Sequence, residues 1–141
     1  MAHGYDTDVK TSARLRRVRP MHTMPELAVR GLLDRLGYRY RLHARQLPGC
    51  PDIVFPGRRK VIFVNGCFWH RHRCPRGRSM PAVNERRWTQ KFRANIERDR
   101  RVLRELKRLR WKTLVVWECQ TSPGRVEKLR HRLLQFLQVK T

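Results

Sequence analysis

The segment from Val64 to Cys74, VNGCFWHRHRC, concentrates two kinds of functional side chain, namely metal ligands and aromatic rings. Cys67, His72 and Cys74 supply three thiolate or imidazole ligands, and Cys119 follows the last apolar strand expected in the chain. Four such ligands match a closed tetrahedral Cys3His arrangement, which is typical of structural zinc. The alternative is four unrelated residues, but burial does not explain cysteines that cluster in a polar loop. We therefore expect a structural zinc site.

Two histidines of this segment, His70 and His72, stand two residues apart. Alternation at that spacing suggests that the rings point to opposite sides. One ring would then bind the metal, with His72 favoured and His70 as the alternative, and the other would be free for chemistry. Asp99 falls on the apolar stripe of a predicted helix, where an inward carboxylate usually has a partner. That partner is either an arginine or His70, which would then act as general base or acid.

Asp52 follows Pro51 at the start of a predicted strand, in a chain with 34 Lys and Arg against 11 Asp and Glu. A carboxylate that faces a polyanion repels it unless a cation intervenes. Mg2+ bound by one or two carboxylates and a substrate phosphate is the usual arrangement for phosphodiester chemistry. The alternative is a turn residue that bonds its own backbone, and for Asp52 considered alone this interpretation is favoured. Glu26 is a second candidate carboxylate, and its alternative role is that of capping-box partner to Thr23.

Two aromatic residues, Phe68 and Trp69, lie between the expected zinc ligands. A loop pinned by a metal is a poor place for core side chains, whereas flat apolar groups can insert between base pairs and bend a duplex. Trp88 either joins this wedge or begins the core stripe of the following helix. Cys50 is left over, and we expect it to be a small, partly buried thiol.

The charge balance indicates a polyanionic partner. The formal net charge is +23 on 141 residues, and most of the basic residues are arginine, which clamps phosphates in a fixed fork. DNA or RNA is therefore favoured over a merely solvated surface. No long apolar run or lipidation signal points to a membrane. The polar start of the chain shows no secretory signal, so we expect a cytoplasmic protein, where thiols favour metals over disulfides.

The elements that must position these residues follow from periodicity. Residues 1–20 read as a basic arm and 21–141 as one domain. We expect helices at 25–37, 84–110 and 123–137, with a core stripe on the long helix that includes Leu103 and Leu109. Strands are expected at 38–43, after Asp52, at 61–64 and at 111–119. The order α-β-β-β-α-β-α predicts an α/β domain with a small mixed central sheet flanked by helices.

Several motifs together resemble the very-short-patch repair (Vsr) DNA mismatch endonucleases of bacteria. They are TMPELAVR, LPGCPDIVFP, VIFVNGCFWHRHRC, KFRANIERDRR and WKTLVVWEC, in that order. The resemblance covers about Arg14 to Cys119 and implies a single restriction-endonuclease-like domain with one structural zinc. It also implies Mg2+-dependent hydrolysis of one DNA strand, 5′ to the mispaired thymine of a T:G mismatch left by deamination of 5-methylcytosine.

The resemblance assigns a role to each candidate by position. Asp52 would bind Mg2+ together with the backbone carbonyl of Val64. His70 would activate the attacking water with Asp99 near it, and Glu26 would hold a metal-bound water. The implied zinc ligands are Cys67, His72, Cys74 and Cys119. The aromatics inserted beside the mismatch from the major groove would be Phe68, Trp69 and Trp88. The arm would reach the minor groove with Leu15 as an apolar wedge among Arg14, Arg16, Arg17 and Arg19.

This sequence departs from the best-known member of the family at a few positions. Asn65 replaces a histidine near the scissile phosphate, and Asn donates a hydrogen bond but carries no proton charge. Val64 replaces a threonine, Leu15 a methionine, and Cys50 an arginine. The loop at 75–83 also differs in length and content.

We expect a monomer on DNA, since a nick needs one active site, and a functional pairing with a cytosine-5 DNA methylase. The alternatives are a restriction-like endonuclease on matched or modified DNA and a non-catalytic, zinc-containing DNA-binding protein.

Overall fold

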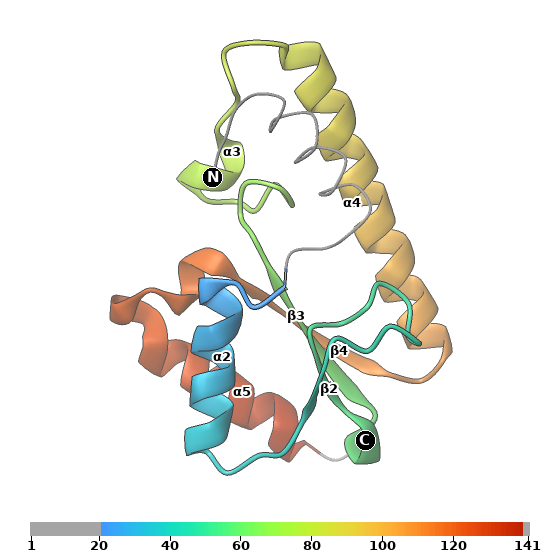
Figure 1. Ribbon diagram of the computed structural model, residues 1–141, viewed down its shortest axis with the longest axis vertical. Coiled ribbons are helices and arrows are strands. Elements are labelled where there is room, and N and C mark those ends of the chain that lie inside the picture. Colours follow the sequence, from blue (N-terminus) through green and yellow to red (C-terminus); the bar gives the residue numbers. More distant parts are fainter. Residues whose placement is uncertain (1–20, 140–141) are drawn as a thin grey trace.

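A four-stranded sheet forms the centre of the computed structural model, which describes residues 21–139 (Figure 1). The arm residues Arg14, Leu15, Arg16, Arg17 and Arg19 lie outside this range. The helices are α2 (Met24–Arg35), α3 (Pro75–Arg78), α4 (Glu85–Arg108) and α5 (Val126–Gln138). The strands are β1 (Arg41–Leu42), β2 (Ile53–Phe55), β3 (Lys60–Asn65) and β4 (Lys112–Trp117). Short 3-10 turns occupy Pro56–Arg58, Glu118–Thr121 and Pro123–Arg125.

The sheet has the order β1-β2-β3-β4 and is mixed, as predicted. β1 pairs with β2 and β2 with β3 in antiparallel fashion, whereas β3 and β4 are parallel. The expected order of the main elements is confirmed. β1, however, has two residues instead of the six at 38–43, and it ends where His43 adopts a φ of 48°. This left-handed backbone interrupts strand geometry. The single turn α3 was not expected.

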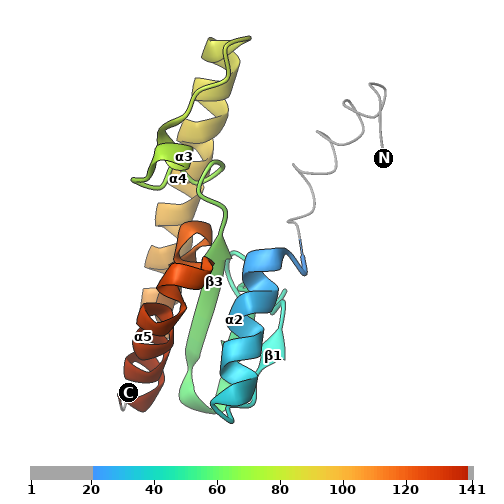
Figure 2. The same ribbon diagram turned by 90° about the vertical axis from the view of Figure 1, so that its left-hand side faces the viewer.

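The helices cover the sheet from both faces and create two apolar cores. On one face, α2 and α5 bury side chains such as Leu33 and Leu133 against Ile62 and Val116. On the other face, α4 packs Leu106 against Phe63 and its neighbours. Figures 1 and 2 show α2 and α5 together beside the sheet, with α4 on the opposite face.

The long helix α4 buries a narrower stripe than its sequence predicts. Phe92 and Leu106 are buried, but Leu103 is 39% and Leu109 is 48% exposed. The expectation that these two leucines belong to the core was wrong. The C-terminal half of α4 touches the sheet along one line through Val102 and Leu106, so leucines away from that line remain in solvent. The N-terminal half of α4 extends past the sheet and lies beside the loop and α3 (Figures 1 and 2).

The parallel pairing of β3 and β4 decides where the functional residues meet. Asn65 pairs with Trp117, so both strands end at the same edge of the sheet. The segments that follow them carry Cys67 and Cys119 and therefore start side by side. Asp52 precedes β2, which runs antiparallel to β3, and so belongs to this same edge. Within residues 21–139 no helix is long and apolar enough to cross a membrane.

Candidate active site and metal centre

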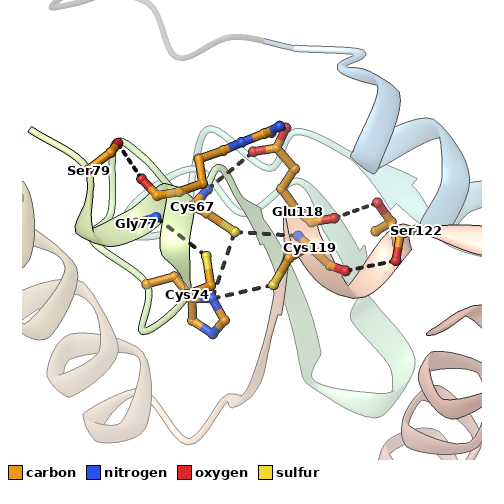
Figure 3. A network of polar contacts seen from close by, with 10 residues as sticks. Cys67, Cys74, Gly77, Ser79, Glu118, Cys119 and Ser122 are labelled. Atoms are coloured by element: carbon orange, nitrogen blue, oxygen red, sulfur yellow. Dashed lines mark hydrogen bonds and ion pairs between the residues drawn. The ribbon is translucent and has the colours of Figure 1, made fainter. Parts of the chain in front are cut away.

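Four metal-ligating side chains converge at the edge where β3 and β4 end. One ligand atom from each of Cys67, His72, Cys74 and Cys119 lies within 4.8 Å of the other three. The Nδ1 atom of His72 is 3.8 Å from the Sγ atom of Cys67 and 3.5 Å from that of Cys119. The thiols of Cys67, Cys74 and Cys119 turn toward one another in Figure 3. This Cys/His cluster can hold a metal ion, and its three sulfurs and one imidazole suit tetrahedral Zn2+.

The chemistry of the ligands also suits a metal. Burial, and then the positive charge of Arg125, lower the pKa of His72 and so favour the neutral ring that binds metals. Burial alone would raise the pKa of the Cys74 thiol, but hydrogen bonds from the backbone N–H of Gly77 and other neighbours bring it below the usual value. Burial raises the pKa of Cys67 to about 12. Without a metal this buried thiol therefore stays protonated at neutral pH.

Neighbouring residues hold the ligands in place. The ring of Trp117 stacks on that of His72, with centroids 4.4 Å apart and planes 18° from parallel. Glu118 accepts the backbone N–H of Cys67 at 3.4 Å and pairs with Arg76 at 2.6 Å. At Gly77 an added Cβ would lie only 1.9 Å from the backbone oxygen of His72. The loop therefore closes only with glycine there.

The second histidine of the segment, His70, faces a different partner. Its Nδ1 atom lies 2.6 Å from Oδ2 of Asp99 on α4. The expected pair of His70 and Asp99 is therefore present, and His72 rather than His70 joins the cysteines. In an extended strand residues two apart point to the same face, so the alternation argument was wrong, and it is the turns of the loop that separate the two rings. A proton on Nδ1 donated to Asp99 leaves a lone pair on Nε2, as a general base requires.

The carboxylate of Asp52 is 3% exposed and is fixed by β3. Its Oδ2 atom accepts the backbone N–H of Val64 at 2.7 Å. In an extended strand the N–H and C=O of one residue point to the same side, so the carbonyl of Val64 also faces the side of Asp52. Asp52 is thus bound across the sheet edge rather than in a local turn. A carboxylate oxygen of Asp52 and the carbonyl oxygen of Val64, both hard ligands on one side of the sheet edge, suit Mg2+.

Glu26 in the first turn of α2 is 1% exposed. Its backbone N–H donates to the Thr23 hydroxyl at 3.3 Å, as a capping box requires. Its own carboxylate, however, accepts the backbone N–H of His22 at 3.1 Å. The same carboxylate contacts His43 Nε2 at 3.0 Å and Arg30 Nη1 at 3.3 Å. The capping interpretation therefore accounts for only part of its bonding.

The aromatic residues pack on one another beside the cysteines. Phe68 lies 5.3 Å from Trp69, 5.6 Å from Trp88 and 5.2 Å from Phe92, measured between ring centroids. Trp88 contacts both the loop aromatics and Phe92, on which it stacks at 5.7 Å, so its packing fits both of its expected roles. Phe68, Trp69 and Trp88 are half-buried, whereas Phe92 on α4 is 4% exposed and forms the floor beneath them. We call these four residues the aromatic cluster.

Asn65 and Cys50 are the remaining candidates in the described part of the chain. Asn65 is 7% exposed at the end of β3, next to this site. Cys50 is half-buried with a φ of 49° and is absent from the Cys/His cluster. None of the four cysteines, all within the described part of the chain, forms a disulfide. Sequence reasoning missed His22, His43 and Trp117. The partners of His43 and Trp117 lie far away along the chain, whereas His22 contacts Glu26 and Arg30 nearby but matches no recognised ligand spacing.

Comparison with known proteins decides the family. The sequence model of the DNA mismatch endonuclease Vsr matches residues 5–76 of this chain.

This protein is a member of the Vsr endonuclease family.

Named relatives agree with this assignment. The chain is 49% identical to the type II nicking enzyme V.XorIIP of Xanthomonas oryzae pv. oryzae over 108 residues, which cover 77% of this chain and 79% of the relative. It is 40% identical to the DNA mismatch endonuclease Vsr of Escherichia coli over 108 residues, covering 77% and 69%. It is 36% identical to the type II nicking enzyme V.NmeAIP of Neisseria meningitidis over 118 residues, covering 81% and 84%. A Vsr endonuclease is a DNA hydrolase, so the non-catalytic alternative is set aside.

Proposed function

We propose that this Vsr-family endonuclease nicks one DNA strand 5′ to the mispaired thymine of a T:G mismatch, in a Mg2+-dependent hydrolysis. The observation that carries the proposal is that two neighbouring histidines have different partners. His72 lies in the Cys/His cluster, while His70 pairs with Asp99 at 2.6 Å. One loop thereby supplies both a metal-held scaffold and a free base.

Hydrolysis of the phosphodiester requires a water that loses its proton as it attacks. Nε2 of His70 is the proposed acceptor of that proton, and Asp99 stabilises the resulting imidazolium through Nδ1. Asp52 and the carbonyl of Val64 would hold Mg2+, which supplies the positive charge that polarises the scissile phosphate. Asn65 would donate a hydrogen bond to a phosphate oxygen, and Glu26 would orient water at the same edge.

Recognition of the mismatch is assigned to the aromatic cluster and the arm. Cys67, His72, Cys74 and Cys119 would hold Zn2+, which ties the loop bearing Phe68 and Trp69 to the sheet. A wobble pair costs less to distort than a matched pair, so flat rings that insert there select by deformability. In the arm, Leu15 would be a minor-groove wedge and the basic residues would contact phosphates, namely Arg14, Arg16, Arg17 and Arg19.

One chain contains every residue assigned above, so we propose that a monomer makes the nick. The T:G substrate arises by deamination of 5-methylcytosine, which supports a functional pairing with a cytosine-5 DNA methylase. A restriction-like activity on matched DNA remains the competing function.

A nicking assay on end-labelled duplexes tests the proposal. We expect one cut strand with T:G and Mg2+, little cleavage of matched T:A, and none with EDTA. Asp52→Asn should lower the rate by about a hundredfold or more, because a metal ligand is lost. Asp34→Asn is the matched control, since Asp34 is exposed on α2 and its side chain accepts a hydrogen bond from Tyr40 at 2.8 Å, away from the sheet edge. Equal cleavage of T:G and T:A would contradict the mismatch proposal, and full activity of Asp52→Asn would contradict the site.

A further inference from the structure

We propose that His22, Glu26 and His43 form a second metal site, which binds a transition-metal ion such as Mn2+, Co2+, Ni2+ or Zn2+. The site lies at the N-terminal end of α2, apart from the Cys/His cluster. One ligand atom from each residue lies within 4.8 Å of the other two. Two imidazoles and one carboxylate with open coordination positions are a known ligand set for divalent transition metals.

The fold brings these three side chains together from separate segments. Glu26 belongs to the first turn of α2, His22 precedes the helix, and His43 follows β1. The rings of His22 and His43 meet edge to face, with centroids 5.0 Å apart. Nε2 of His43 lies 3.0 Å from Oε2 of Glu26, and the His43 side chain is only 12% exposed. Glu26 and His43 are thus shielded from water, whereas His22 is exposed and closes the site from the solvent side.

A cation already contacts two of the three ligands. Nη1 of Arg30 lies 2.9 Å from Nδ1 of His22 and 3.3 Å from Oε2 of Glu26. A guanidinium N–H only donates, so Nδ1 of His22 directs its lone pair at this positive charge. Arg30 therefore marks the point to which the lone pairs of His22 and Glu26 converge, and His43 adds a third ligand when Nε2 gives up the proton that it shares with Glu26. Its side chain is 23% exposed and can withdraw toward solvent when a metal takes its place.

The backbone also brings both histidines to Glu26. His22 and His43 adopt left-handed backbone angles, with φ of 57° and 48°, and the turn at each residue directs its ring toward the carboxylate. The ion pair between Arg30 and Glu26 is the contact that a bound metal ion would replace.

The ligand chemistry separates this site from the two others. Imidazole nitrogen disfavours Mg2+, which prefers oxygen ligands, and the absence of thiolates here distinguishes the site from the Cys/His cluster. Insofar as Glu26 serves the proposed nicking reaction, occupancy would withdraw Glu26 from it. Micromolar transition metal should then inhibit nicking.

Binding of Co2+ tests the site without reference to catalysis. The protein is loaded with one Zn2+ per chain and carries Asp52→Asn, so that the Asp52 position does not compete. Titration is followed by calorimetry and visible absorption. We expect one further Co2+ per chain, with weak d–d bands and no thiolate charge-transfer band. His22→Ala and His43→Ala should each weaken binding about tenfold or more, and His131→Ala, an exposed histidine of α5, should not.

Arg30→Gln removes the competing cation and should tighten binding. Three results would overturn the proposal. They are no second Co2+ even in Arg30→Gln, Co2+ seen only with a thiolate band, and equal affinity in the His22 and His43 variants. Because the readout is binding to a nicking-deficient chain, failure of the proposed nicking function would leave this result unaffected.

Discussion

The two ends of β3 are stabilised in different ways. At its start, near Lys60, the sheet lies between helices, and leucine, isoleucine and valine side chains are buried between them. At its end, Asn65 leads into a loop in which a Cys/His cluster and half-buried rings replace an aliphatic core. The first end follows the ordinary rule of apolar burial. The second holds polar and aromatic groups near the surface, where substrate can reach them, and needs another source of order.

This contrast implies that the loop after β3 can lose its order while the sheet and the helices around the start of β3 stay folded. The aromatic cluster has only Phe92 as a buried member, so its packing provides less stabilisation than the aliphatic cores do. A metal ion held by four ligands would supply the missing free energy, as in small zinc domains. The predictions below alter one end at a time.

The largest effect is expected from loss of a cluster ligand. Cys67→Ser should reduce bound zinc and lower nicking by about a hundredfold, because a displacement of about 1 Å at the chemistry has that cost. The far-UV circular dichroism should change little, since the two apolar cores that hold α2, α5 and the sheet include none of the cluster ligands. Cys50→Ser is the matched control and should keep both zinc and activity. Normal nicking by a zinc-free Cys67→Ser protein would contradict a structural role for the metal.

A substitution in the apolar core should lower the stability of the domain without removing zinc. Leu133 is fully buried between α5 and the sheet. Leu133→Ala should lower the free energy of unfolding by about 2–5 kcal/mol through lost burial and a cavity, measured by urea denaturation. Zinc content at low temperature should be unchanged. Leu27→Ala, at a residue 44% exposed on α2, should change stability by no more than about 0.5 kcal/mol. If Leu133→Ala also lost zinc at low temperature, the two ends of β3 would not be stabilised separately.

A smaller and pH-dependent effect is expected at Lys60. Its ammonium group is 1% exposed and donates to the backbone carbonyls of Phe136 and Val139 at the end of α5. Lys60→Met should lower the free energy of unfolding by about 1–3 kcal/mol, because these carbonyls at the end of α5 lose their donor.

The sign of the pH dependence follows from the environment of Lys60. Burial, and then the charges of Lys112 and Arg58, lower the pKa of Lys60 below its ordinary 10.5. Between that lowered pKa and 10.5 the unfolded chain binds more protons than the native one, so stability from this group rises with pH. The difference in unfolding free energy between wild type and Lys60→Met should therefore increase toward pH 10.5. A difference that falls with pH would contradict the assignment.

Much of the candidate site could be predicted because its signals are local. Cys67, His72 and Cys74 share one polar loop, and Asp99 interrupts the apolar stripe of a helix. The residues that were missed depend on distant partners. Trp117 stacks on His72 only because β3 and β4 are parallel and end together. His43 meets Glu26 only because the backbone turns at a positive φ just after β1. Neither arrangement has a local sequence signal.

The fold shows the same limit. Continuous apolar runs identified β2, β3 and β4. Such runs are typical of strands buried on both faces, which describes β2 and β3, whereas the edge strand β4 is mostly half-buried. The alternation at 38–43 predicted six strand residues, but only Arg41 and Leu42 find partners in β2. Helical periodicity placed Leu103 and Leu109 in the core, although α4 touches the sheet along one line. Pattern therefore predicts which face is apolar, while the partner element decides how much of it is covered.

The most direct test of the account compares His70→Ala with His72→Ala, measuring bound zinc and the single-turnover nicking rate of a T:G duplex in the same preparations. We predict that His70→Ala keeps one zinc per chain and nicks about a hundredfold or more slowly, as expected for loss of a general base. His72→Ala should bind zinc poorly. Wild-type nicking by a zinc-loaded His70→Ala protein, or loss of zinc in that variant, would contradict the division of tasks between the two histidines.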